Sequence, residues 1–144
     1  MKIITAQQTR KICLTGATVA YAPSPAETAS YVRMIAALAG ALGGKAVAQA
    51  EAESYALLVG ATEKTNALLA GKQNAFAICA EADGVTLCGT DALSTLMAVQ
   101  YFKENLVGEE IPLTIVAEDI ATLIYISPPK PLASRRSGAL TEFI

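Results

Sequence analysis

Apolar residues recur at helical spacing in two long segments, and this spacing predicts one helix over residues 26–42 and another over residues 92–106. In the first segment, one face consists of large side chains: Tyr31, Ile35, Leu38 and Leu42. In the second, one face should pack on a sheet: Thr95, Ala98, Val99, Phe102 and Leu106. Each helix therefore has one side that requires burial.

Capping residues flank both helices. Ser24 is suited to the N-cap of the first helix, with Pro25 at its first position and Glu27 completing a capping box. Gly43-Gly44 should end this helix. Gly89-Thr90-Asp91 should begin the second one.

Short runs of β-branched and apolar residues predict strands between and after these helices. The Asp83-Gly84 step predicts a β-hairpin, because Asp-Gly favours the tight turns that join antiparallel strands. A short helix is expected over residues 62–70, ending at Gly71. The expected strands are residues 12–21, 46–50, 55–59, 75–80, 84–88, 111–116 and 122–127.

These elements indicate an α/β (α+β) fold. We expect a two-layer sandwich in which a mixed sheet of about four to six strands carries two long helices on one face. Residues 1–127 should form a single domain, and residues 128–144 a proline-rich and basic C-terminal tail.

Composition narrows the function classes. The 144-residue chain has a formal net charge of -2 and no His. That charge argues against a nucleic-acid binder, which normally carries a concentrated basic face. The lack of His excludes Ser-His-Asp triads and most zinc sites. We therefore expect no metal and no cofactor. Only 17% of residues are charged, against about 25% in a typical soluble domain, which suggests apolar surface that needs a partner.

Three cysteines, Cys13, Cys79 and Cys88, are scattered without metal-binding spacing. Reduced, packed thiols are the favoured interpretation. Cys79 and Cys88 lie on neighbouring predicted strands, so a disulfide between them is the alternative.

No segment directs the chain to a membrane. The N-terminus lacks the apolar core of a signal peptide, and the longest apolar stretch, residues 34–42, is too short to span a bilayer. As written the chain should be a soluble cytoplasmic protein, whereas an excised or mature domain of an extracellular protein would look the same.

One turn is a candidate ligand site. Gly60, Thr62 and Lys64 follow a predicted strand and begin a helix, so their amides and hydroxyls would suit an anion or a sugar hydroxyl. The simpler interpretation is a capped strand-to-helix turn with no ligand.

Four acidic pairs raise the question of glycosidase chemistry, which uses two carboxylates. All four fall in predicted turns or connections, where solvated acids are the rule: Glu51/Glu53, Glu81/Asp83, Glu109/Glu110 and Glu118/Asp119. We therefore assign no catalytic residue.

The outer sides of the two long helices predict an interface. Leu93, Leu96, Met97 and Tyr101 lie away from the expected sheet-facing side of the second helix. On the first helix, Arg33 is the only charge opposite the large apolar stripe. A second copy of the chain or a missing neighbouring domain would cover this surface. The alternative is that residues 122–131 fold back over it.

Several of these motifs resemble a known domain. The strand followed by Gly60-Ala61-Thr62, the Asp83-Gly84 turn and the helix starting at Gly89-Thr90-Asp91 resemble the small α/β domain that precedes the catalytic barrel in glycoside hydrolases. Family 20 hexosaminidases and family 67 α-glucuronidases contain it, as do many uncharacterised bacterial proteins. The resemblance covers residues 12–107 and includes the first helix with its terminal Gly43-Gly44.

This resemblance implies a non-catalytic accessory or interaction domain, because in those families the reacting residues belong to the barrel. Two other classes stay open. One is a small ligand-binding protein or enzyme with its site at the turn from Gly60 to Lys64; the other is a self-assembling structural subunit.

Overall fold

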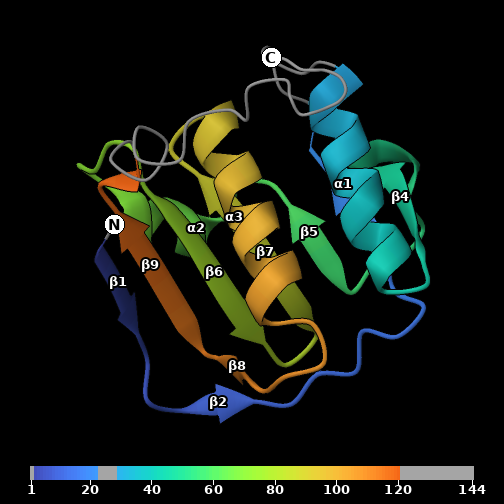
Figure 1. The fold of residues 1–144 in the computed structure, drawn as a ribbon, viewed down its shortest axis with the longest axis horizontal. Coiled ribbons are helices and arrows are strands. Elements are labelled where there is room, and N and C mark those ends of the chain that lie inside the picture. Colours follow the sequence, from blue (N-terminus) through green and yellow to red (C-terminus); the bar gives the residue numbers. More distant parts are fainter. Residues whose placement is uncertain (1, 23–28, 121–144) are drawn as a thin grey trace, which may run out of the picture.

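A computed structural model describes residues 2–22 and 29–120 of the chain. Its centre is a mixed sheet with strand order β1-β9-β6-β7-β5-β3-β4 (Figure 1). Neighbours from β4 to β7 run parallel, whereas those from β7 to β1 run antiparallel. The strands are β1 (Lys2–Thr5), β3 (Thr18–Tyr21), β4 (Lys45–Ala48), β5 (Leu57–Val59), β6 (Phe76–Glu81), β7 (Gly84–Gly89) and β9 (Thr114–Glu118).

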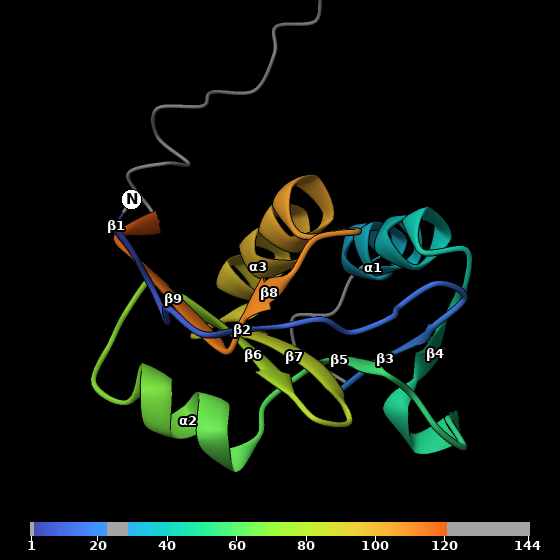
Figure 2. The same cartoon turned by 90° about the horizontal axis from the view of Figure 1, so that it is seen from below.

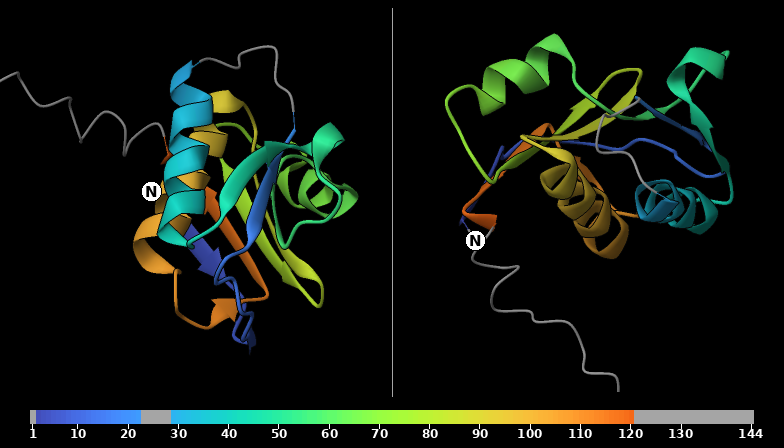
Figure 3. Two further views of the ribbon diagram at one scale, coloured as in Figure 1. Left: turned by 90° about the vertical axis from the view of Figure 1, so that its right-hand side faces the viewer. Right: turned by 90° about the horizontal axis from the view of Figure 1, so that it is seen from above.

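Two long helices cover one face of this sheet. Helix α1 (Ala29–Ala41) lies over the parallel half and α3 (Ala92–Asn105) over β6 and β7 (Figure 2). A short helix, α2 (Glu63–Leu69), lies on the opposite face, as both views of Figure 3 show. The expected α/β sandwich with two long helices on one face is confirmed. None of the described helices has the length and apolarity needed to cross a membrane.

The helix faces pack as their spacing predicts. Tyr31, Ile35 and Leu38 of α1 are at most 4% exposed, and the sheet-facing residues of α3 are likewise buried. They join alternate residues of the strands, such as Leu57 and Val59, in one large core cluster. A smaller apolar cluster under α2 includes Leu69 and uses the other side of the same strands.

Local capping signals place the helix ends. Gly43 has a φ of 77°, its N–H donates to Gly40 O over 3.0 Å, and the N–H of Gly44 donates to Ala39 O over 2.9 Å. This is the paired hydrogen bonding of a Schellman motif, and it ends α1 where the glycines predict. At the start of α3, Asp91 Oδ1 accepts a hydrogen bond from the N–H of Ser94 over 2.7 Å.

The sheet has seven strands, more than the four to six expected from the sequence. The additional strand is β1, which pairs with β9 although all four of its residues are exposed. A separate two-stranded ladder joins β2 (Thr9–Arg10) to β8 (Ile111–Pro112). Neither β1 nor β2 shows a strong pattern in sequence, because their pairing depends on backbone groups offered by distant strands.

Some other boundaries differ from the expected ones. The strand expected over residues 12–21 is confined to β3, because Gly16 adopts a φ of 73° and its N–H donates to Leu42 O at the end of α1. Residues 49–51 form a single 3₁₀ turn after β4. The expected cap at residues 24–27, the strand at 122–127 and the tail at 128–144 lie outside the described residues.

The β6–β7 hairpin forms across Ala82 and Asp83, as the Asp-Gly signal predicts. Its register places Cys79 opposite Thr86, and Cys88 opposite Ala77, so the two cysteines do not face each other directly. Both thiols are free and buried, and Cys13 is free and exposed. The favoured interpretation of packed, reduced Cys79 and Cys88 is therefore confirmed.

Candidate functional site

The turn between β5 and α2 is held by its own residues. Thr62 Oγ1 accepts a hydrogen bond from the N–H of Thr65 over 3.2 Å, and Thr65 Oγ1 accepts one from the N–H of Thr62 over 2.8 Å. These two bonds form a reciprocal capping box. The N–H of Gly60 donates to Leu87 O over 2.9 Å, which ties the turn to β7.

Lys64, the remaining candidate residue of this turn, also has a partner within the chain. Its Nζ lies 3.2 Å from Oε2 of Glu81 at the end of β6, and both side chains are about half exposed. Gly60 packs against Ala22, because a Cβ at this glycine would come within 2.8 Å of the Cβ of Ala22. The turn thus brings the three predicted residues together, each already in contact with other parts of the fold.

We expect Thr62→Ala to lower the free energy of unfolding by about 1 kcal/mol, because the substitution removes the N-cap hydroxyl of α2. Urea denaturation measures this loss. The matched control is Asn66→Ala, an exposed position on the same helix, which should change stability by less than about 0.5 kcal/mol. Equal stability of the two variants would contradict a stabilising capping box.

A small cavity of about 200 Å³ lies beside this turn. Leu58 and Thr86 of the neighbouring strands line it, together with Thr62. Its mouth carries Tyr55, which is 38% exposed and whose Oη accepts a hydrogen bond from Gln49 Nε2 over 3.1 Å. The acidic pair Glu81/Asp83 completes the lining.

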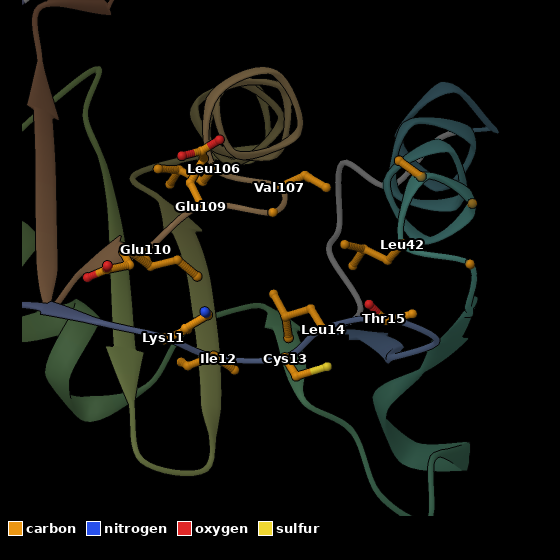
Figure 4. A pocket seen from close by; sticks show the side chains of 15 residues that line it. Lys11, Ile12, Cys13, Leu14, Thr15, Leu42, Leu106, Val107, Glu109 and Glu110 are labelled. Carbon is orange, nitrogen blue, oxygen red and sulfur yellow. The ribbon is translucent and has the colours of Figure 1, made fainter.

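A larger cavity of about 760 Å³, here called the helix-end groove, lies at the other end of the fold from the start of α3 (Figure 4). Three segments line it: residues 11–15 between β2 and β3, residues 40–43 at the end of α1, and residues 106–111 after α3. Figure 4 shows Leu14, Leu42 and Val107 around the space between the two helix ends.

Charged side chains surround the apolar part of this groove. Lys11 comes from the segment between β2 and β3, and Glu109 and Glu110 follow α3. Glu110 Oε1 accepts a hydrogen bond from Thr9 Oγ1 over 2.6 Å. The exposed thiol of Cys13 also lines the groove.

Sequence reasoning missed the helix-end groove. The available signals were the glycines that end the two helices, Gly43-Gly44 and Gly108. They show where each helix stops, but the proximity of these ends follows from helix packing.

The other acidic pairs lie apart from one another. Glu51 and Glu53 are exposed around the 3₁₀ turn, on a different segment from the groove. Glu118 lies in β9, where its Oε2 is 3.1 Å from Lys72 Nζ. In the described part of the chain, no three His, Cys, Asp or Glu side chains are grouped so that they could hold a metal ion.

The buried thiols lie on the face of the sheet that carries α2. Burial is the main cause that raises the pKa of both Cys79 and Cys88 above the ordinary thiol value. Lys64 acts against this effect at Cys79, and a hydrogen bond with Thr65 does so at Cys88. Because the thiolate is the reactive form, both thiols should react slowly.

The residues predicted to form an interface differ in exposure. Leu93 is 53% exposed, whereas Leu96, Met97 and Tyr101 are partly buried and pack against the large core cluster. The ring of Tyr101 lies 5.8 Å from that of Phe76 on β6, at an interplanar angle of 48°. Arg33 is exposed on α1.

No model of a known protein family matches this chain, and no curated protein matches it in sequence. Solved structures do match. A structure of CpGH84D covers 81% of this chain at 10% identity with a TM-score of 0.55, and the match spans 22% of that protein.

Two further structures match with lower TM-scores. BtGH115A, a family GH115 4-O-methyl-alpha-glucuronidase with specificity for decorated arabinogalactans, matches 78% of this chain and 16% of its own at 18% identity, with a TM-score of 0.44. The chitobiase FjGH20 of Flavobacterium johnsoniae matches 81% of this chain and 19% of its own at 10% identity, with a TM-score of 0.49.

The chain thus spans only about a fifth of the length of these proteins, between 16% and 22%. At such low identity the similarity concerns the fold. The expected resemblance is confirmed at that level: the chain folds like a small part of the glycoside hydrolase CpGH84D.

Proposed function

We propose that this chain is a non-catalytic accessory or interaction domain that works beside a carbohydrate-active protein. The observation that carries the proposal is the unequal coverage of the match with CpGH84D, which includes 81% of this chain but 22% of the larger one. A fold that occurs as a small part of a large hydrolase suits a supporting role, although fold likeness alone does not determine function.

The apolar surface supports a partner for this domain. Leu93, Met97 and Tyr101 follow one another at intervals of four residues, so they form one stripe along α3. Because Tyr101 contacts Phe76 on β6, this stripe lies on the side of α3 that faces away from α1. Beyond it, no described helix covers β9 and β1 (Figure 2). A second copy of the chain or a neighbouring domain is the proposed partner for this stripe, with Arg33 on α1 as a polar contact.

Specific observations favour the two alternative functions. The cavity beside the Gly60–Lys64 turn, with Tyr55 at its mouth, would suit a small ligand such as a carbohydrate, since aromatic rings and carboxylates bind sugars well. The exposed Ile3 and Ile4 on the edge strand β1 would suit self-assembly, because an open apolar edge pairs readily with another strand.

One set of measurements on the purified chain tests the proposal. We expect no turnover of a panel of aryl-glycosides, because the proposed role is supportive. By light scattering at micromolar concentration we expect association of the wild type, and a monomer for the variant Leu93→Glu/Met97→Glu, because two carboxylates would be buried at the interface. Arg33→Ala should weaken association less. The control Glu51→Gln/Glu53→Gln leaves the stripe intact and should associate like the wild type.

Two results would overturn parts of this proposal. Glycoside turnover that is lost in Glu51→Gln or Glu81→Gln would replace the accessory role with an enzymatic one. A monomeric wild type that is as soluble and stable as Leu93→Glu/Met97→Glu would remove the stripe as a contact surface between copies. A catalytic barrel encoded beside this chain in the genome would then identify the partner as a neighbouring domain.

A further inference from the structure

The floor of the helix-end groove has the side-chain pattern of a strand without belonging to one. Lys11, Cys13 and Thr15 are exposed, whereas Ile12 is half-buried and Leu14 is 7% exposed. Such alternation is typical of a strand with one side on the core. The segment lies directly after β2 and crosses the space between β2 and β3 (Figures 1 and 4).

The backbone of this segment is open to a partner. The N–H of Leu113 donates to Gln8 O over 3.0 Å, and Arg10 is paired with Ile111, but the ladder goes no further. Among the described residues, no hydrogen bond engages the N–H groups of residues 11–15. Backbone donors and acceptors of this kind are the groups through which an extended peptide adds to a strand.

The charges around the groove favour a cationic partner. The ion pairs of the described residues are Lys64–Glu81 and Lys72–Glu118, so Glu109 and Glu110 at the groove have no cationic partner there. The C-terminal ends of α1 and α3 both line the groove, and each carries a partial negative charge of about half a unit. The last turn of α1 contains no basic residue that would offset it. Lys11 compensates only part of this negative charge.

We propose that the helix-end groove binds an extended peptide segment with alternating apolar and basic residues, which adds as a strand along residues 11–15. Its backbone would pair with the open N–H and C=O groups of that segment. Its apolar side chains would contact Leu14, Leu42 and Val107, and its basic side chains would meet Glu109 and Glu110. This interaction goes beyond the accessory role, since it requires no carbohydrate and no hydrolase.

Cys13 provides a reporter inside the groove, because its thiol is exposed there while Cys79 and Cys88 are buried. The experiment measures the labelling rate of Cys13 with a thiol reagent in the full chain, and Cys13→Ser identifies the signal. The probe is the synthetic peptide Lys-Val-Arg-Val-Lys-Val. At ten times its Kd about one-eleventh of the sites stay free, so labelling should slow about tenfold. Fluorescence anisotropy of the labelled peptide gives the Kd.

Three matched controls isolate the proposed contacts. The peptide Glu-Val-Glu-Val-Glu-Val tests charge, and a version of the basic probe with N-methylated alternate amides tests backbone pairing; neither should protect Cys13. Glu109→Lys/Glu110→Lys should abolish protection, whereas Glu51→Lys/Glu53→Lys, which makes the same charge change elsewhere, should retain it. Thermal melts establish that each variant is folded.

Unchanged Cys13 labelling with the basic peptide would overturn the proposal. Equal protection by the acidic or the N-methylated peptide would also overturn it, because neither charge nor strand pairing would then be required. Labelling that slows with protein concentration in the absence of peptide would assign the groove to a second copy of the chain instead.

Discussion

Phe102→Ala should lower the free energy of unfolding by about 3–5 kcal/mol, the usual cost of truncating a buried aromatic side chain to alanine. Phe102 is 0% exposed, and it belongs to the cluster that joins α3 to the sheet. Its removal deletes apolar contacts and leaves a cavity between these two layers, which the neighbouring strands can fill only in part. Urea denaturation followed by far-UV circular dichroism measures the loss.

Leu93→Ala is the matched control, since this residue lies on the same helix but is 53% exposed. We expect its stability to remain within about 0.5 kcal/mol of the wild type. A similar loss in both variants would mean that Leu93 is buried in solution, as it would be in a stable dimer. Repeating the measurement at several protein concentrations distinguishes that case, because the stability of a dimer depends on concentration.

Gly44→Ala and Gly40→Ala should change stability in opposite directions. A Cβ at Gly44 would lie 1.8 Å from the backbone oxygen of Ala17 and 2.7 Å from its carbonyl carbon, and neither atom can move without displacing the chain. We expect a loss of about 1–3 kcal/mol or more from this overpacking. Denaturation curves of the two variants are directly comparable, since each adds a single methyl group near the same end of α1.

Gly40 provides the control for Gly44. It is an exposed residue within α1, and a Cβ there would meet nothing within 4 Å. Alanine is a better helix former than glycine, so we expect a gain of about 0.5–1 kcal/mol. Destabilisation by both substitutions would show that the end of α1 packs more tightly around Gly40 than the structure indicates.

Much of the local structure could be predicted from sequence, because short-range interactions determine it. Asp91 and Thr62 cap their helices through hydrogen bonds to residues three positions later. Gly43 ends α1 by adopting the positive φ that glycine tolerates, and Asp83-Gly84 turns the β6–β7 hairpin. Each of these interactions lies within a few residues of chain, so the sequence pattern contains all of its participants.

The candidate sites were predictable only in part. The residues of the Gly60–Lys64 turn are close in sequence, so their proximity was evident, but the contact between Lys64 and Glu81 joins positions far apart in the chain. The helix-end groove combines three segments that no short pattern connects. Its open backbone at residues 11–15 becomes apparent only when every neighbouring hydrogen bond is known.

The sequence by itself determined the two long helices, their buried faces, the hairpin and the α/β class, because periodicity and turn chemistry act locally. The tertiary structure alone decided the seven-stranded order, the pairing of β1 with β9, and the meeting of two helix ends over residues 11–15. The physical reason is that β1 is exposed and short, so its position follows from the backbone hydrogen bonds that β9 offers more than a hundred residues later.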